Sequence, residues 1–407
     1  MTNILSFVIV GHVDHGKSTL VGRLLYDTDS LSSDKIEEMR KRSTELGHDI
    51  EFAYLLDHLE EERVQGITID TTQVFFKSKK RRYVIIDAPG HVEFVKNMVT
   101  GASQANTAIL IIDAAQGVQE QTRRHAYILS LLGLRGVTVV INKMDLVGFD
   151  KCQFESIEKD ITDFLNRIDV HVNVCIPIAA KTGDNVVSRS NEMNWYKGPT
   201  TMEALDAVEI DIRRDSATFI FPVQDVFKLD DERVILGTIE SGSIRENEYV
   251  SVLPTLQKTK INKLKVFGRE IAEASAGESI GVITQAPVFL DRGMVLVNDE
   301  NDVVCSDTIQ AHLFWMHPKS YALGDKVDIR IATQEVRCVI EMVVKKINSS
   351  TLELINAAEA EIKNLEVAQV KIKTKKAVMY KRFQDNQGVG RFVLVRDGSI
   401  CAGGIII

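Results

Sequence analysis

Long apolar runs and paired cysteines are both missing from this sequence. No stretch approaches the roughly 18 unbroken apolar residues of a membrane-spanning helix. The apolar start at Ile4–Val10 follows no basic region and precedes no small-residue cleavage site, so we expect a buried first strand rather than a signal peptide. The five cysteines lie far apart without a C-x-x-C pair, which argues against disulfides and structural zinc and favours a reducing cytoplasm.

Basic residues are fewer than acidic ones, 49 against 57. The net charge of −8 argues against broad electrostatic binding to nucleic acid, although a local basic patch can exist within an acidic total. The one compact basic run, from Lys77 to Arg82, lies between two apolar runs and is interpreted as a solvated hairpin turn. The rest of the composition, 44% hydrophobic and 26% charged over 407 residues, is that of a soluble globular protein of two to three domains.

The first ~210 residues alternate short apolar runs with longer amphipathic ones. Apolar strands without polar alternation, interleaved with helices, predict a mostly parallel sheet that is covered on both faces. The predicted strands are Ile4–Val10, Gln73–Phe76, Tyr83–Ile86, Ala108–Asp113, Val137–Asn142 and Val172–Pro177. The predicted helices are Ser18–Tyr26, Ser33–Leu46, Thr122–Leu132, Glu155–Arg167 and Pro199–Val208.

The pattern changes near residue 212. From Phe219 onward, short β-rich runs are separated by Gly, Asn and Asp turn residues, and a second β-rich stretch begins near Asp307. Two small β-barrels are the economical interpretation, because closure removes exposed strand edges. The predicted fold is therefore an α/β domain at residues 1–211, followed by all-β barrel domains at residues 212–304 and 305–407.

The segment Gly11-His-Val-Asp-His-Gly-Lys-Ser18 fits G-x-x-x-x-G-K-[ST] between a predicted strand and a predicted helix. Glycines let backbone N–H groups surround phosphates, and the helix N-terminus faces them with partial positive charge. We expect Lys17 to reach the β- and γ-phosphates and Ser18 to ligate magnesium. A chance glycine turn is the alternative for this motif alone. The expected binding residues are Gly11, Asp14, His15, Gly16, Lys17, Ser18 and Thr19.

Two further motifs follow predicted strands in the order that a guanine-nucleotide site requires. Asp87 and Gly90 form Asp-x-x-Gly, in which Asp87 would hold magnesium and the Gly90 N–H would approach the γ-phosphate. Asn142-Lys143-Met-Asp145 would bind the base. Asp145 can accept hydrogen bonds from N1–H and the exocyclic amine of guanine, whereas adenine offers neither donor and would leave the carboxylate unpaired.

Three weaker signals complete the expected site. Thr68 is expected to sense the γ-phosphate and magnesium, so that its segment is ordered in the GTP state. His91, directly after Gly90, could orient the attacking water, which gives His91, Lys17 and Thr68 as catalytic candidates and Ser18, Thr68 and Asp87 as metal ligands. After the last strand, the Ala180 N–H could meet guanine O6, with Ala179 and Lys181 beside it.

Together these motifs resemble the translation-factor GTPases, the superfamily of elongation factor Tu and elongation factor 1-alpha. GHVDHGKST, ERVQGITID, DAPGH and NKMD carry the resemblance, which covers nearly the whole chain. This resemblance implies an α/β P-loop GTPase domain followed by two all-β barrel domains, with GTP and Mg²⁺ as cofactors.

Longer stretches resemble one branch, the large GTPase subunit of heterodimeric sulfate adenylyltransferase. They are GRLLYDTDSL, QTRRHAYILSLLGL, GDNVVSRSNEMNWYKGPT, AHLFWM and GRFVLVRDGSICAGGIII. This resemblance implies that a smaller partner subunit makes adenylyl sulfate and pyrophosphate from ATP and sulfate, while GTP hydrolysis on this chain drives the uphill reaction. It does not imply a membrane or a nucleic-acid partner.

Some features depart from that branch. It usually has Asp at the place of His15, where this chain has the elongation-factor spelling, and Ala179 replaces the family's usual Ser. The alternative is therefore a carrier that delivers aminoacyl-tRNA to the ribosome, although Arg124 stands where an elongation factor usually has Glu. A regulatory GTPase without an enzymatic partner is a third possibility. Trp195 and Tyr196 either contact a partner or fasten their loop to the core, and Trp315 is expected in a barrel core.

Overall fold

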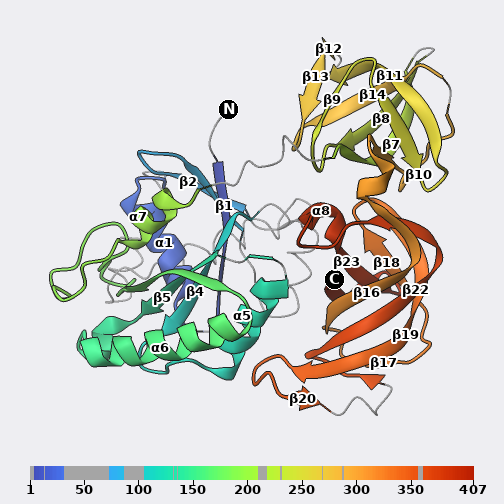
Figure 1. The fold of residues 1–407 in the computed structure, drawn as a ribbon. Helices are drawn as coiled ribbons and strands as arrows, with labels where there is room; N and C mark the ends of the chain where they lie inside the picture. The colour runs from blue at the N-terminus through green and yellow to red at the C-terminus, as the bar shows by residue number, and fades with distance from the viewer. Residues whose placement is uncertain are drawn as a thin grey trace. The chain divides into compact units, whose positions relative to one another are not determined.

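The computed structural model divides into two compact units (Figure 1). One contains Met1–Ile210 with Ser349–Thr351, and the other contains Asp211–Asn348 with Leu352–Ile407. No helix in the part of the chain that the structure describes is both long and apolar enough to cross a bilayer. The structure describes residues 4–12, 14–31, 73–86, 105–131, 133–134, 136–209, 218–229, 232–267, 269–286, 288–355 and 361–407.

The first unit is built on a six-stranded sheet with the order β2-β3-β1-β4-β5-β6. The five strands from β3 to β6 in this order run parallel, and β2 is antiparallel to β3. The carboxyl ends of the five parallel strands therefore lie at one edge of the sheet, which is where ligands bind in open α/β sheets. The strands are β1 Ile4–Gly11, β2 Gln73–Lys77, β3 Arg82–Ile86, β4 Thr107–Asp113, β5 Gly136–Asn142 and β6 His171–Pro177.

Helices cover this sheet on both faces, as the sequence predicts. Side chains alternate along a strand, so Phe7 and Ile9 point to the face that packs against Leu20 of α1 and Leu205 of α7. On the opposite face, α5 contacts β1 and β4, and α6 contacts β5 and β6. The helices are α1 Lys17–Asp27, α5 Glu120–Leu131, α6 Lys151–Arg167 and α7 Thr201–Ala207.

Local capping explains where the later helices begin. Asp150 accepts a hydrogen bond from the Cys152 N–H, so α6 starts four residues before the predicted Glu155. Thr200 and Glu203 form a capping box at the start of α7. The predicted helix over residues 33–46 lies outside the described residues.

The basic run forms the predicted hairpin between β2 and β3. Lys79 and Lys80 are exposed at its turn. Arg81 differs from the expected solvated residue, because its guanidinium donates to the carbonyl oxygens of Asp206 and Val208. The turn therefore anchors the end of the α7 segment as well as reversing the chain.

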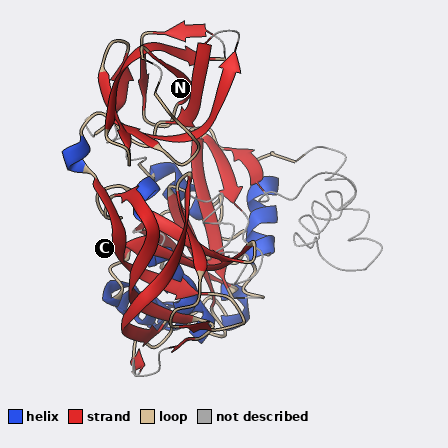
Figure 2. Ribbon diagram, turned by 90° about the vertical axis from the view of Figure 1, so that its right-hand side faces the viewer, coloured by secondary structure: helices blue, strands red, loops and turns tan. Residues whose placement is uncertain are grey.

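The second unit contains two closed antiparallel barrels (Figures 1 and 2), as predicted. In the first barrel, the order β10-β15-β7-β8-β14-β11 closes through pairing of β10 with β11. Its strands are β7 Ile220–Leu229, β8 Glu232–Thr238, β10 Tyr249–Leu253, β11 Gln257–Val266, β14 Ser279–Thr284 and β15 Val295–Val297. The short strands β9 Ser243–Arg245, β12 Arg269–Ile271 and β13 Glu273–Ser275 lie outside this closed set.

The second barrel has the order β18-β23-β24-β16-β22-β19 and closes between β18 and β19. Its long strands β19 and β22 pair over most of their length. The strands are β16 Val304–Trp315, β18 Val327–Ile331, β19 Gln334–Asn348, β22 Glu366–Tyr380, β23 Arg391–Arg396 and β24 Ser399–Ile406. Short strands β17 Tyr321–Ala322, β20 Leu354–Ile355 and β21 Glu361–Ile362, and helix α8 Gln387–Gly390, complete it.

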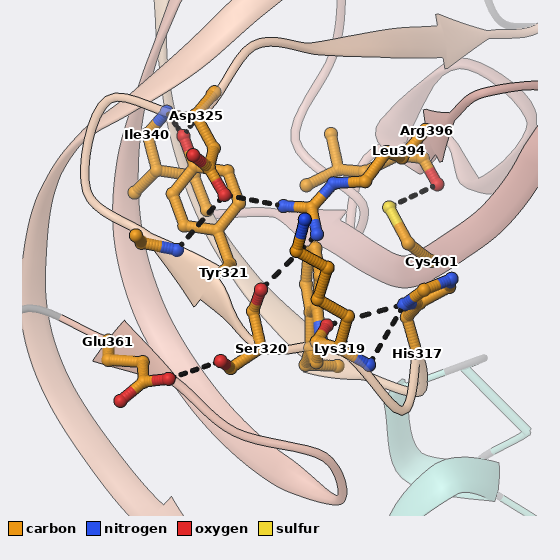
Figure 3. Close-up of polar contacts among 12 residues, drawn as sticks. His317, Lys319, Ser320, Tyr321, Asp325, Ile340, Glu361, Leu394, Arg396 and Cys401 are labelled. Atoms are coloured by element: carbon orange, nitrogen blue, oxygen red, sulfur yellow. Dashed lines mark hydrogen bonds and ion pairs between the residues drawn. The ribbon is translucent and has the colours of Figure 1, made fainter.

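A partly buried polar network organises one part of this barrel. Figure 3 shows the Arg396 guanidinium between the Asp325 carboxylate and the Ser320 backbone, with Nη2 2.8 Å from Asp325 Oδ2. Arg396 also lies over the rings of Trp315 and Tyr321. The Trp315 indole N–H donates to the Lys319 carbonyl at 3.0 Å, and the side chain is fully buried. Trp315 is therefore a barrel-core residue, as predicted.

We expect Trp315→Ala to destabilise this barrel by about 3–5 kcal/mol, because it removes a large buried ring and leaves the Arg396 face uncovered. The measurement is the urea midpoint of the β-sheet circular dichroism signal. Leu323→Ala, an exposed substitution in the same barrel, is the control and should stay within about 0.5 kcal/mol. Equal midpoints for the two variants would contradict the assignment.

Candidate nucleotide-binding site

The predicted phosphate loop forms a tight turn between β1 and α1. Asp14 and Gly16 have positive φ angles of 64° and 90°, so the backbone curls before α1 begins at Lys17. A Cβ on Gly16 would lie 2.4 Å from Asn142 Nδ2, and one on Gly11 would lie 2.5 Å from the Ile111 carbonyl oxygen. Glycine is therefore required at both positions. The loop leads directly into a helix N-terminus, the arrangement that binds phosphate.

Lys17 lies across this loop. Its ammonium donates to the carbonyl oxygens of Gly11 and His12, at 2.9 Å each. Ser18 and Thr19 follow in the first turn of α1, and both are partly exposed. A cation and the first-turn hydroxyl groups are thus held at one end of the loop, as phosphate and magnesium binding require.

His15, one of the expected binding residues, turns its side chain toward β4. Its side chain is fully buried, and its Nδ1 lies 3.3 Å from the Ile111 carbonyl oxygen of β4. Burial lowers the pKa of His15, and the Ile111 carbonyl only partly opposes this shift. The imidazole therefore packs between the phosphate loop and β4 as a neutral group, while Asp14 in the same loop is exposed to solvent.

Asn142 joins three loops through one buried amide. Its Nδ2 donates to the His15 carbonyl in the phosphate loop, and its Oδ1 accepts from the Ala180 N–H in the loop after β6, both at 2.9 Å. The expected contact of Asn142 with the loop is present. The Ala180 N–H, which the sequence predicts to face guanine O6, is donated to Asn142 in this structure. Ala180 instead positions the amide.

The remaining base-motif residues surround the start of a 3-10 helix at Met144–Val147. Lys143 has a φ of 63° and places its ammonium 2.8 Å from Asp113 Oδ2. Burial would raise the pKa of Asp113, but the Lys143 ammonium and the Ala115 N–H outweigh it and hold the pKa below its usual value. Asp145 is half-buried. Sequence reasoning missed Asp113, although an acidic residue ending the strand beside the base motif was a usable signal.

The loop after β6 is held by hydrogen bonds that do not need a serine hydroxyl at position 179. Backbone hydrogen bonds link Ala179 and Asp184 in both directions, at 3.2 and 3.1 Å. The Asp184 carboxylate then accepts from the hydroxyl groups of Thr182 and Ser190. The exposed Lys181 ends the motif. These contacts link the two ends of the loop without a hydroxyl group at position 179.

Trp195 fastens its loop to α6 and to the turn before it. The indole N–H donates to the Phe149 carbonyl at 3.1 Å, and the ring packs 5.4 Å from that of Phe154. Tyr196 donates to the Pro199 carbonyl. The fastening interpretation therefore accounts for both aromatic residues.

Four predicted site residues, Thr68, Asp87, Gly90 and His91, lie outside the described residues. β3 ends at Ile86, one residue before Asp87. Of the three predicted magnesium ligands, the structure therefore places Ser18 alone. It brings Gly11, Gly16, Lys17, Asn142 and Ala180 together at the carboxyl edge of the sheet.

Three family models match the chain in sequence. The Elongation factor Tu GTP binding domain matches residues 2–252, Elongation factor Tu domain 2 matches 232–297, and the GTP-eEF1A C-terminal domain-like model matches 308–407. The chain belongs to the translation-factor GTPase superfamily, in the family of sulfate adenylyltransferase subunit 1. It is thus a GTP-binding protein of the GTPase class.

Relatives with curated names support the narrower family. Sulfate adenylyltransferase subunit 1 of Aliivibrio fischeri is 35% identical over 97% of this chain and 83% of its own length. The bifunctional enzyme NodQ of a Rhizobium species is 37% identical over 97% of this chain, which spans 61% of that relative's length. A solved structure of sup35 with GMPPNP is 25% identical over the whole chain with a TM-score of 0.46, so the family assignment rests on the sequence matches.

We expect Gly16→Ala to weaken GDP binding by about tenfold or more, because the new methyl group would displace the Asn142 amide from the His15 carbonyl. Isothermal titration of the purified chain measures this change. Gly117→Ala is the matched control, since Gly117 also has a positive φ, 69°, but has nothing within 4 Å of the added methyl. An unchanged affinity in Gly16→Ala would show that the close approach to Asn142 is not needed for binding.

Proposed function

We propose that this chain is the GTP-hydrolysing subunit of a sulfate adenylyltransferase. In this proposal, a smaller partner subunit forms adenylyl sulfate and pyrophosphate from ATP and sulfate, and GTP hydrolysis on this chain drives that uphill reaction. The observation that carries the proposal is the single buried amide of Asn142, which ties the phosphate loop to the base motif in a chain whose relatives are named sulfate adenylyltransferase subunit 1.

Guanine recognition is assigned to Asp145. Its carboxylate would accept hydrogen bonds from N1–H and the exocyclic amine, with the Lys143 stem over one face of the base. Asn142 keeps this motif in register with the phosphate loop. Adenine nucleotides would leave the half-buried carboxylate without donors, which explains why GTP rather than ATP would occupy this site.

Phosphate chemistry is assigned to the other end of the site. Lys17 and the N-terminus of α1 would neutralise charge on the β- and γ-phosphates, and Gly90 would offer its N–H to the γ-phosphate. His91 would orient the attacking water. Ser18, Thr68 and Asp87 would hold Mg²⁺, whose chemistry when bound is further neutralisation of phosphate charge. The partly exposed Ser18 in the first turn of α1 fits this assignment.

Coupling requires an element with two states that both the γ-phosphate and the partner subunit bias. The segments around Thr68 and around Gly90–His91 are assigned this role, because each adjoins a residue that would contact the γ-phosphate or its magnesium. Energy then passes between subunits through the conformation of these segments, and the partner retains the sulfate chemistry.

Base recognition can be tested by Asp145→Asn. We expect GTP affinity to fall by about tenfold or more and affinity for xanthosine triphosphate to rise, because an amide can donate where the xanthine base accepts. Competition binding with both nucleotides measures the change in preference. If the variant binds GTP as wild type does, Asp145 does not read the base.

The coupling itself is tested by purifying the tagged chain from its native cell and identifying bound proteins by mass spectrometry. The same eluate is assayed for GTP-dependent release of pyrophosphate from ATP and sulfate. We expect one small adenylyltransferase and this activity, with GDP as the negative control. Recovery of ribosomal proteins, tRNA and a nucleotide-exchange factor would instead support the elongation-factor alternative and overturn the proposal.

A further inference from the structure

We propose that Asp113 is a positioning residue for guanine, whose carboxylate holds the Lys143 ammonium so that the Lys143 stem is already in place to cover the base. This inference rests on the proposed guanine site. It assigns no contact between Asp113 and the nucleotide. Its role is to act through Lys143.

The sheet register places the two residues side by side. β4 and β5 are parallel neighbours, and Asp113 is the register partner of Asn142, the residue before Lys143. The Ala114 N–H donates to the Asn142 carbonyl at 2.8 Å, which continues the pairing one step past β4. All residues of β4 are buried, so the Asp113 side chain leaves a rigid strand end. Its position is fixed by the same sheet edge that presents the base motif.

The two carboxylate oxygens of Asp113 have separate partners. Oδ1 accepts from the backbone N–H of Ala115 at 2.8 Å, which stabilises the turn after β4. Oδ2 lies 2.8 Å from the Lys143 ammonium. An asparagine could make the first contact equally well, because that contact needs only an acceptor. The second contact is the one that uses a negative charge.

The negative charge of Asp113 is almost completely shielded from water. The Asp113 side chain is 2% exposed and that of Lys143 is 29% exposed. A carboxylate with so little access to water is destabilised unless it is paired. The Lys143 ammonium and the Ala115 N–H keep the pKa of Asp113 below its usual value, so the carboxylate is ionised at neutral pH. The strand end thus carries a buried negative charge with a cationic partner from the base motif.

Pairing of the ammonium constrains the rest of the lysine side chain. A free lysine loses rotamer entropy when it is ordered, and a contact that orders it beforehand removes part of that penalty from ligand binding. Here the backbone end is set by the φ of 63° and the other end by Asp113. The four-carbon stem between these points is a preordered apolar surface for a flat base.

This role differs from that of Asp145 in a way that experiment can detect. Asp145 would read donors on the base edge, so its loss changes nucleotide preference. The Lys143 stem would pack on the ring face, which guanine and hypoxanthine share. Loss of Asp113 should therefore weaken binding of GDP and IDP by the same factor and leave their ratio unchanged.

The experiment uses Asp113→Asn in the full chain, because asparagine keeps the acceptor for the Ala115 N–H and removes the charge. We expect the dissociation constants for both GDP and IDP to rise about tenfold. Asp160→Asn is the matched control. It removes an exposed ion pair with Arg123 in the same unit, 3.0 Å long, and should change affinity by no more than about twofold. Unchanged GDP affinity in Asp113→Asn, or a changed ratio of GDP to IDP, would overturn the proposal.

A double-mutant cycle separates positioning from a role in folding. Lys143→Met keeps an apolar stem but has no cation, so adding Asp113→Asn to it should change GDP affinity by no more than about twofold. The same loss in both backgrounds would mean that Asp113 acts through the turn and not through Lys143. Wild-type chain that binds no guanine nucleotide would instead refute the proposed function itself.

A second comparison applies if Asp113→Asn does not fold. Lys143→Met should then bind GDP about fivefold more tightly than Lys143→Ala, because only methionine retains a stem that can cover the ring. Equal affinities of these two variants would overturn the claim that the stem covers the base.

Discussion

The amide of Asn142 is the interaction on which the rest of the nucleotide site depends. A buried amide must satisfy both its donor and its acceptor, and here the only way that the structure does so is to bond the phosphate loop on one side and the loop after β6 on the other. Three segments that are distant in sequence are thereby held in one geometry. The glycine at position 16 follows from this, because any larger residue would occupy the space of the amide.

Charge is distributed around this amide in two separate groups. Lys17 is bound to carbonyl oxygens of the phosphate loop, while Lys143 is bound to Asp113 at the neighbouring strand end. Each cation is thus fixed near the part of the ligand that it would contact, one near phosphate and one near the base. The neutral, buried His15 lies below the phosphate loop and adds no charge to either group.

The second unit achieves order by different means. Barrel closure pairs β10 with β11 and β18 with β19, so the six-stranded sets have no free edges. In the second barrel, a largely buried arginine lies over two aromatic rings and donates to the Ser320 carbonyl and the Asp325 carboxylate. Both barrels are recognisable as short alternating strands in the sequence because each has one face in a core and one outside.

The sequence by itself determined the alternating strands and helices of the described part of the first unit, the two barrels and the nucleotide motifs, because apolar periodicity and short glycine-rich motifs act over a few residues. It also predicted Gly16, Lys17 and Asn142 as binding residues, and the structure brings the three close together. Tertiary structure alone decided that the Ala180 N–H serves Asn142, that His15 is buried, and that Asp113 holds Lys143. Each of these depends on which strands become neighbours and in what register, and the contacts join residues 30 or more positions apart, so no local pattern fixes them.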